Sequence, residues 1–478
     1  MTAPAINISD SVPTSTVHRW GEMVLRVAFG LLLVLLLGLA YLDWRLIPLI
    51  PALCVGIGVW LWASANPLLH LCLVIAGAAL AFEHSPGLSP PEIVYGLYYL
   101  NYLLFWMVYH VLLRRDPIIT SVPDALVLGY FVWASATFAF TLLYGGDVRH
   151  GFSEWLPTTY LLFYFPIRHH CIRHPRAFLY IASAFAFLAL FVVLRNAIVY
   201  YIDMQNADAI WKVMANRERL NERFLLIGSV GAILFLLHAR QWFTRTVYFG
   251  LTSLYMVGVV ISQARALWVA IVLALAVAFV FLDAERRTRM IVTVTLWAGL
   301  VLLAAYLILG DFFMVVLLGL LERLLTLQGA ATRDVSLVNR FVEWQAALEQ
   351  IAQNPVLGHG FGVDYSYYSL VFEATYYTSH VHNTFIGIWY RHGLVGLSMY
   401  VALWAIVLWR AWIMLRAKHI DPQIRLIVLI CFSSLLALLL ASNTEAFMLT
   451  DDSVLVHLLP MALVIGIWDR RSYETHLA

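Results

Sequence analysis

The chain has 478 residues, of which 62% are hydrophobic and 12% are charged, and its mean hydropathy is +0.82. Soluble domains are about half apolar and a quarter charged, so this composition excludes an ordinary soluble enzyme. The net charge of +2 is small, and we expect no nucleic-acid partner.

Apolar runs of about 20 residues, the length that crosses a bilayer, recur along the whole chain. Only helices and closed barrels satisfy their backbone hydrogen bonds in lipid. We therefore predict an all-α polytopic membrane protein with about 12 to 14 transmembrane helices. The candidate spans are 22–42, 46–63, 67–82, 95–113, 124–143, 155–168, 176–198, 223–239, 246–262, 266–282, 289–309, 385–415, 424–442 and 453–469.

Basic residues gather in alternate loops between these spans, as the positive-inside rule describes for the cytoplasmic side. The basic loops are Arg114-Arg115, Arg168–Arg176, Arg240–Arg245, Arg286–Arg289, Arg410–Arg425 and Arg470-Arg471. Both termini fall on the same side, and the long segment 310–384 falls on the opposite side. We expect one membrane domain in three parts, with helices at 1–309 and 385–478 and an extracytoplasmic loop at 310–384.

Four arginines lie on the outer face in this topology: Arg195, Arg223, Arg265 and Arg340. Guanidinium groups bind phosphate oxygens in a bidentate fork, so converging arginines suit a pyrophosphate. The alternative is that they are anchors at span ends, with charged heads reaching the interface. Arg195 fits both interpretations. Arg265 favours a functional role, because it interrupts an apolar stretch inside a short turn.

The outer loop is predicted to begin with an apolar interfacial helix at Phe312–Leu327. A second helix follows, with Phe341, Trp344, Leu348 and Ile351 on one apolar face. Arg340 and Glu343 begin this helix, and Arg340 lies off the apolar stripe, where it can face a cavity. Asn354-Pro355 ends the helix, and three glycines between 358 and 362 permit a tight return.

Two histidines, His380 and His382, close the loop beside Asn383. A neutral imidazole accepts a proton from a hydroxyl near neutral pH, which suits a general base. The H-x-H spacing also occurs in metal sites, but no further metal-binding cluster accompanies it, and we expect no metal. A structural interpretation remains open, in which both histidines are hydrogen-bonded and Asn383 caps a helix.

Several tyrosines precede these histidines, among them Tyr367, Tyr376 and Tyr377. Aromatic rings stack on sugar faces, so these residues are candidate glycan contacts. An interfacial aromatic belt is the common alternative for tyrosines at a membrane surface. The glycines at 393 and 396 predict a break in the helix that follows.

The order of these motifs resembles the O-antigen ligase and polymerase superfamily. The matching residues are Ser262-x-x-Arg265-Ala, Arg340 with Trp344, Asn354-Pro355-x-x-Gly358-x-Gly360-x-Gly362, His382-Asn383-Thr-Phe and Gly393-x-x-Gly396. They occupy about a sixth of the chain. The resemblance implies a C-type glycosyltransferase fold in the bacterial inner membrane, without a metal or other cofactor. It also implies a periplasmic active site and both termini in the cytoplasm.

The resemblance implies that His382 is the essential histidine and that Arg265 and a second arginine bind the pyrophosphate of the donor. Arg195 and Arg223 are both candidates for that second arginine, with Arg340 as a further contact; His380, Asn383 and Glu343 would support the site. The donor would be an undecaprenyl-pyrophosphate-linked O-antigen and the acceptor lipid A–core, within membrane lipid. We expect a ligase, because loop 310–384 is much larger than 200–222 and no long region follows Arg471.

Three alternatives stay open at this point. Two are related enzymes, an O-antigen polymerase and a protein O-oligosaccharyltransferase. The third is a transporter or flippase of lipid-linked sugars, which would also have many spans and cavity arginines. Paired broken helices in matching halves would favour the transporter, and we find no such pairing in the sequence.

Overall fold

The computed structural model describes residues 66–78, 90–206, 218, 220–309, 314, 318, 335–417, 419–443 and 451–477. The chain divides into two compact units, residues 1–70 and 71–478, and the second contains nearly all of the described residues. The predicted spans 22–42 and 46–63 lie outside the described part, as does the predicted helix Phe312–Leu327 apart from residues 314 and 318.

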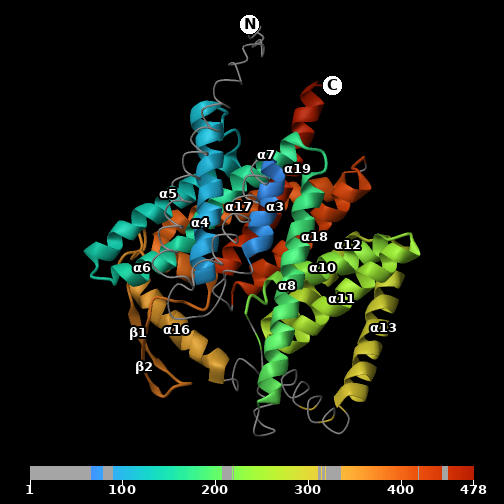
Figure 1. Cartoon of the computed structure of the whole chain (residues 1–478). Helices are drawn as coiled ribbons and strands as arrows, with labels where there is room; N and C mark the ends of the chain where they lie inside the picture. The colour runs from blue at the N-terminus through green and yellow to red at the C-terminus, as the bar shows by residue number, and fades with distance from the viewer. Residues whose placement is uncertain are drawn as a thin grey trace, which may run out of the picture. The chain divides into compact units, whose positions relative to one another are not determined.

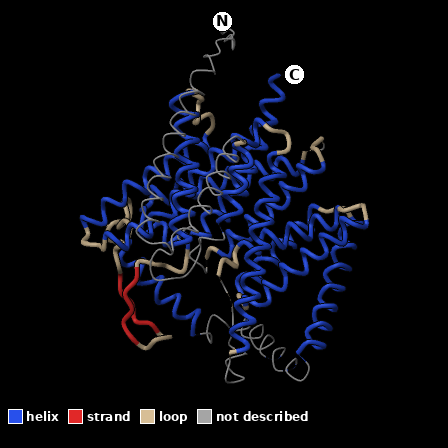
Figure 2. Tube along the Cα trace, viewed as in Figure 1, coloured by secondary structure: helices blue, strands red, loops and turns tan. Residues whose placement is uncertain are grey.

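Helices make up most of the second unit (Figure 2). The first half contains α3 (Pro67–Gly77), α4 (Pro90–Met107), η3 (Val108–Leu113), α5 (Val122–Leu143), α6 (Val148–Trp155), η4 (Leu156–Phe163), α7 (Tyr164–Arg173) and α8 (Ala177–Gln205). The second half contains α10 (Phe224–His238), α11 (Trp242–Ser262), α12 (Arg265–Phe281), α13 (Ala284–Leu309), α16 (Val335–Ile351), β1 (Tyr365–Ser369), β2 (Ala374–Thr378), α17 (Thr384–Arg416), α18 (Pro422–Ala441) and α19 (Asp451–Leu477).

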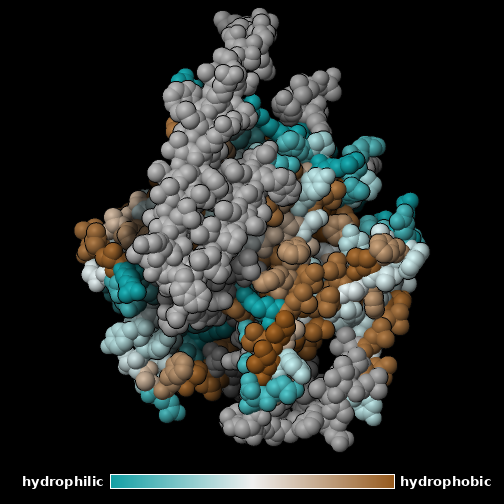
Figure 3. Space-filling model, viewed as in Figure 1, coloured by the Kyte–Doolittle hydropathy of each residue, from teal (hydrophilic) through white to brown (hydrophobic). Residues whose placement is uncertain are grey.

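Seven helices in the described residues are long and apolar enough to cross a membrane. They run over Ile93–Leu113, Val122–Leu143, Ala177–Gln205, Trp242–Ser262, Thr384–Arg416, Pro422–Ala441 and Ser453–Arg471. The shorter apolar helices α3, α10 and α12 match three further predicted spans. Hydrophobic residues are exposed over the region of α8 to α13, as Figure 3 shows in brown, which is the pattern of a lipid-facing surface. The chain is therefore a multi-pass membrane protein.

One prediction about the elements is wrong. Residues 155–168 do not form one α-helix, because the chain passes through the 3₁₀ segment η4 into α7. The described residues are mostly helical, in agreement with the predicted all-α class, and β1 and β2 add an antiparallel hairpin in which Tyr367 pairs with Tyr376. The signal for the hairpin is the period-two burial of β1, in which Tyr365, Tyr367 and Ser369 face inward.

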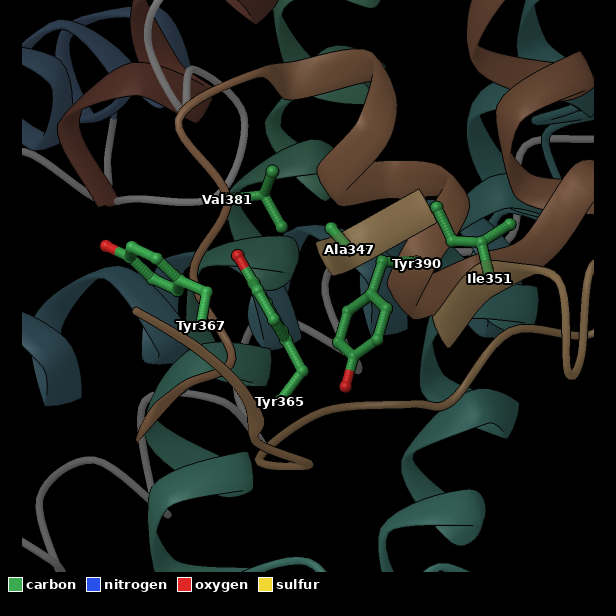
Figure 4. Packing of buried hydrophobic residues seen from close by; sticks show 6 residues of the cluster. All are labelled: Ala347, Ile351, Tyr365, Tyr367, Val381 and Tyr390. Carbon is green, nitrogen blue, oxygen red and sulfur yellow. The ribbon is translucent and has the colours of Figure 1, made fainter. Parts of the chain in front are cut away.

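The most buried span is α19, which packs against α7, η4, α17 and α18. The loop segment 335–383 forms a small head on this bundle, in which α16 packs against β1 and the start of α17. Ala347 and Ile351 of α16 meet Tyr365, Tyr367 and Tyr390 there (Figure 4). Figure 1 shows α16 and the hairpin at the lower end of the view, while α7 lies near the upper end.

The buried face of α16 differs from the predicted one. Asn339, Glu343, Ala347 and Ile351 are buried at helical spacing, whereas Phe341 and Leu348 are 44% and 42% exposed. Ile351 alone of the predicted stripe lies in the core of the head. The prediction failed because a polar residue, Glu343, occupies the inner face.

Candidate active site

The His382 imidazole and the Glu343 carboxylate form a pair at the centre of the head. Each carboxylate oxygen lies 3.0 Å from His382 Nδ1. A carboxylate only accepts hydrogen bonds, so Nδ1 carries a proton, and in the neutral imidazole Nε2 then has the lone pair. The Glu343 side chain is 1% exposed and that of His382 is 42% exposed. The arrangement therefore holds an oriented, accessible base on a buried anion.

The carboxylate of Glu343 has further donors, as burial of a charge requires. The backbone N–H of His382 donates to Oε1 at 3.3 Å, and the Tyr365 hydroxyl donates at 3.4 Å. Trp344 Nε1 donates to the His382 carbonyl at 3.2 Å. Glu343 and Trp344 of α16 thus both bond to His382, and Tyr365 of β1 bonds to Glu343.

The neighbouring residues His380 and Asn383 have different surroundings. The His380 ring lies edge-on to His382, with 5.2 Å between centroids. Burial, with smaller contributions from the nearby Arg391, His382 and Arg223, lowers the pKa of His380 to about 3. Asn383 caps α17, because its Oδ1 accepts from the backbone N–H of Phe385 and Ile386. The structural interpretation is thus confirmed for Asn383, while His382 remains accessible.

The glycine turn passes directly over a break in α17. Gly393 has φ 62° within that helix, so the predicted break is confirmed. His359 and Gly360 donate backbone hydrogen bonds to the carbonyls of Tyr390 and Arg391, at 2.8 and 2.9 Å. Gly358 has φ 81°, and a Cβ there would lie 2.5 Å from the Arg391 oxygen. The approach of the two backbones requires glycine.

Sequence reasoning missed a second ion pair, between Glu154 of α6 and Arg391 of α17. Arg391 is 1% exposed, and its Nη2 lies 2.6 Å from Glu154 Oε1. Glu154 also accepts from Ser379 Oγ, at 2.5 Å, and from the backbone N–H of Gly362, at 2.7 Å. One carboxylate therefore joins the glycine turn, the histidine loop and the break in α17. No sequence pattern marked Glu154, whereas Arg391 is a charge at membrane depth.

A small open cleft lies where α10, α12 and α18 meet. Arg223 and Glu222 form its polar end, and Leu226, Leu267 and Leu438 are among its apolar lining residues. Arg265 is the first residue of α12, immediately before the lining residue Ala266. Of the predicted arginines, Arg223 therefore lines this cleft, and Arg265 lies next to a lining residue in the sequence.

The segment that carries His382 is hydrogen-bonded to residues at the end of α18, one of the helices around this cleft. The Thr384 backbone N–H donates to Ser442 O at 2.9 Å, and Asn383 Nδ2 donates to Asn443 O at 3.0 Å. These two acceptors directly follow Ala441, a cleft residue at the end of α18. Arg223 donates to Ser453 Oγ of α19, and its charge acts on His380. The segment that carries His382 is thus hydrogen-bonded to the end of α18 that borders the cleft.

The remaining predicted residues lie around this site. Arg195 Nη2 donates to Leu220 O at 3.2 Å and to Asn196, so it supports the segment before Arg223. Arg340 lies in α16, nearly one turn before Glu343. Tyr367 is 8% exposed within the core of the head, whereas Tyr376 and Tyr377 are 47% and 70% exposed. Two of the three candidate glycan contacts are therefore accessible.

Comparison with known families identifies the central part of the chain. Residues 249–401 match the family described as O-antigen ligase. The match includes α12 with Arg265, α16 with Glu343 and the His382 loop. No curated protein matches the chain. The resemblance seen in the motifs is confirmed.

Proposed function

We propose that this chain, which belongs to the O-antigen ligase superfamily, is the ligase that transfers a glycan from undecaprenyl pyrophosphate to lipid A–core. The observation that carries the proposal is the Glu343–His382 pair, and a cleft with Arg223 at its polar end supports it. The superfamily covers ligase and polymerase activities, and the choice of donor and acceptor is our inference from the resemblance to that superfamily.

His382 acts as the general base in this proposal. Its Nε2 takes the proton from an acceptor sugar hydroxyl, and the oxygen attacks the anomeric carbon of the donor. The bond from that carbon to the pyrophosphate oxygen breaks, so the configuration inverts and undecaprenyl pyrophosphate leaves. The imidazolium that forms is stabilised by Glu343, 3.0 Å from Nδ1. We expect no metal in this step.

Arg223 and Arg265 would bind the donor pyrophosphate. Charge develops on the leaving oxygen, and fixed guanidinium groups stabilise it most where water is excluded. The start of α12 adds backbone N–H groups and the positive end of a helix dipole. The apolar wall formed by Leu226, Leu267 and Leu438 suits the first isoprene units of the carrier. Arg195 and Arg340 would act from outside this pair.

The proposed topology follows from the basic loops. The head at residues 335–383 would face the periplasm, and both termini would lie in the cytoplasm, with the bundle in the bacterial inner membrane. The acceptor would approach from the periplasmic side, where Tyr376 and Tyr377 are exposed on β2. Membrane segments 1–309 and 385–478 would hold the loop 310–384 at the surface.

The proposal is tested with purified protein in nanodiscs, undecaprenyl-pyrophosphate glycan as donor and lipid A–core as acceptor. A ligase adds the glycan to lipid A–core. Longer donor-linked glycans without that product would assign the polymerase activity instead. Glycosylated serine or threonine in an added acceptor protein would assign the protein transferase, and the absence of any covalent product would favour a transporter.

A further inference from the structure

Three potential metal ligands meet far from the transfer site, where the end of α4 approaches α7. His110, Asp116 and His169 each offer one ligand atom, and these atoms lie within 4.8 Å of one another. Figure 1 shows α7 near the upper end of the view, opposite α16 and the hairpin. The transfer reaction leaves this cluster unexplained.

The backbone is shaped to bring His110 and Asp116 together. The α4 helix widens into the π-helical turn Val108–Leu113, and such turns often mark functional sites. The Asp116 backbone N–H then donates to His110 O at 2.8 Å, across Arg115 with φ 55°. As a result His110 Nδ1 lies 2.8 Å from Asp116 Oδ2. An uninterrupted α-helix would separate these two side chains.

The third residue, His169, comes from α7. Its ring centroid lies 4.3 Å from that of His110, and the rings are inclined by 59°. The adjacent His170 is 4% exposed, and neither of its ring nitrogens has a hydrogen-bond partner. The described part around His169 therefore contains one imidazole, that of His170, whose nitrogens take part in no hydrogen bond.

We propose that His110, Asp116 and His169 bind a divalent transition-metal ion of the zinc class. Two neutral imidazoles and one carboxylate are donors that Zn²⁺ and Co²⁺ accept, with water or a further ligand in the fourth position. The Asp116 side chain is 25% exposed, whereas that of His110 is 8% exposed. An ion therefore has access from the Asp116 side.

Arg173 is the main feature that opposes an ion here. Its Nη2 lies 3.6 Å from Asp116 Oδ2, and the Arg173 side chain is 47% exposed. Without an ion, Asp116 is shared by Arg173 and His110, which is an ordinary pairing. With an ion, Arg173 is an outer partner of the carboxylate, and its charge weakens the site. Removal of the Arg173 charge is therefore expected to strengthen metal binding.

The role that this position suggests is structural. The ion would join the end of α4 to α7, and α7 packs against the buried helix α19. Metal that binds only the folded protein raises its stability. We therefore expect chelation to lower the melting temperature without any change in the transfer chemistry at His382.

The test uses the full-length protein in nanodiscs, purified through a tag without histidines. After chelation, Zn²⁺ binding is measured by calorimetry, and Co²⁺ loading by its visible absorption. We expect one ion per chain, with binding at least tenfold weaker in Asp116→Asn and His169→Ala. His238→Ala is the matched control, because His238 belongs to α10 and bonds to its own helix at Leu234 O.

Arg173→Ala makes the test independent of general loss of folding, because it is expected to bind Zn²⁺ more tightly than wild type. Asp116→Asn and His169→Ala samples are compared only where their elution and melting show folded protein. The proposal is overturned if the wild-type protein binds no Zn²⁺ at micromolar concentration. It is also overturned if a folded Asp116→Asn protein binds Zn²⁺ as wild type does.

Discussion

Glu343→Gln is the substitution that tests the role of the buried carboxylate most closely. Glutamine has nearly the same shape, so the 3.0 Å contact to His382 Nδ1 can persist as a neutral hydrogen bond. What is lost is the charge that stabilises the imidazolium. Hydrogen bonds to charged groups contribute about 1.5–3 kcal/mol, which corresponds to a rate loss of roughly ten- to a hundredfold.

The assay is single-turnover glycan transfer at saturating donor and acceptor, followed by separation of the lipid-linked products. Glu349→Gln is the matched control, because Glu349 lies on the same helix, is exposed and bonds to Gln345. We expect the control to transfer at the wild-type rate. A Glu343→Gln protein that is folded and transfers within twofold of wild type would refute the assigned role of Glu343.

Three further predictions concern the surroundings of the pair. Arg223→Ala is expected to weaken donor binding about tenfold or more, and binding measured alongside Arg195→Ala should show a smaller effect for Arg195. Gly358→Ala is expected to lower the free energy of unfolding by at least about 1–3 kcal/mol, because residue 358 has a φ of 81° and its new Cβ would lie 2.5 Å from Arg391 O. Thermal unfolding measures the loss, and the control Gly250→Ala should show none, because the space around Gly250 is open. The pKa of His380 is lowered to about 3 in the folded protein. Below about pH 6.5 the unfolded chain therefore binds a proton at this residue and the folded protein does not, so the free energy of unfolding falls with decreasing pH. The fall between pH 6.5 and 5 is at most about 2 kcal/mol, and an unchanged pH dependence of melting in His380→Gln would contradict it.

The sequence predicted much of the bundle because lipid restricts the possibilities. Apolar runs located α4, α5, α8, α11, α17, α18 and α19, although α8 and α19 extend past the predicted ends at 198 and 469 to Gln205 and Leu477. Glycine spacing predicted the break in α17, since a kink at Gly393 follows from local backbone chemistry. His382 and Glu343 were each singled out, but 39 residues separate them. Only the fold shows that they form a pair.

The errors share one physical cause, which is that local patterns do not specify the inner face of a functional helix. Hydrophobic periodicity assigned Phe341 and Leu348 to the core of α16, whereas the buried row contains Glu343. A hydrophobic pattern does not mark a buried anion, so it misses Glu343. Tyr367 was expected at the surface and packs inward, because the hairpin alternation of β1 was not recognised.

The most direct test of the account separates donor binding from chemistry in His382→Ala. Binding of undecaprenyl-pyrophosphate glycan and single-turnover transfer to lipid A–core are measured on the same nanodisc preparations. We predict wild-type donor affinity, because the arginines remain, together with a transfer rate reduced at least about a hundredfold. Transfer by folded His382→Ala protein at the wild-type rate would contradict the account.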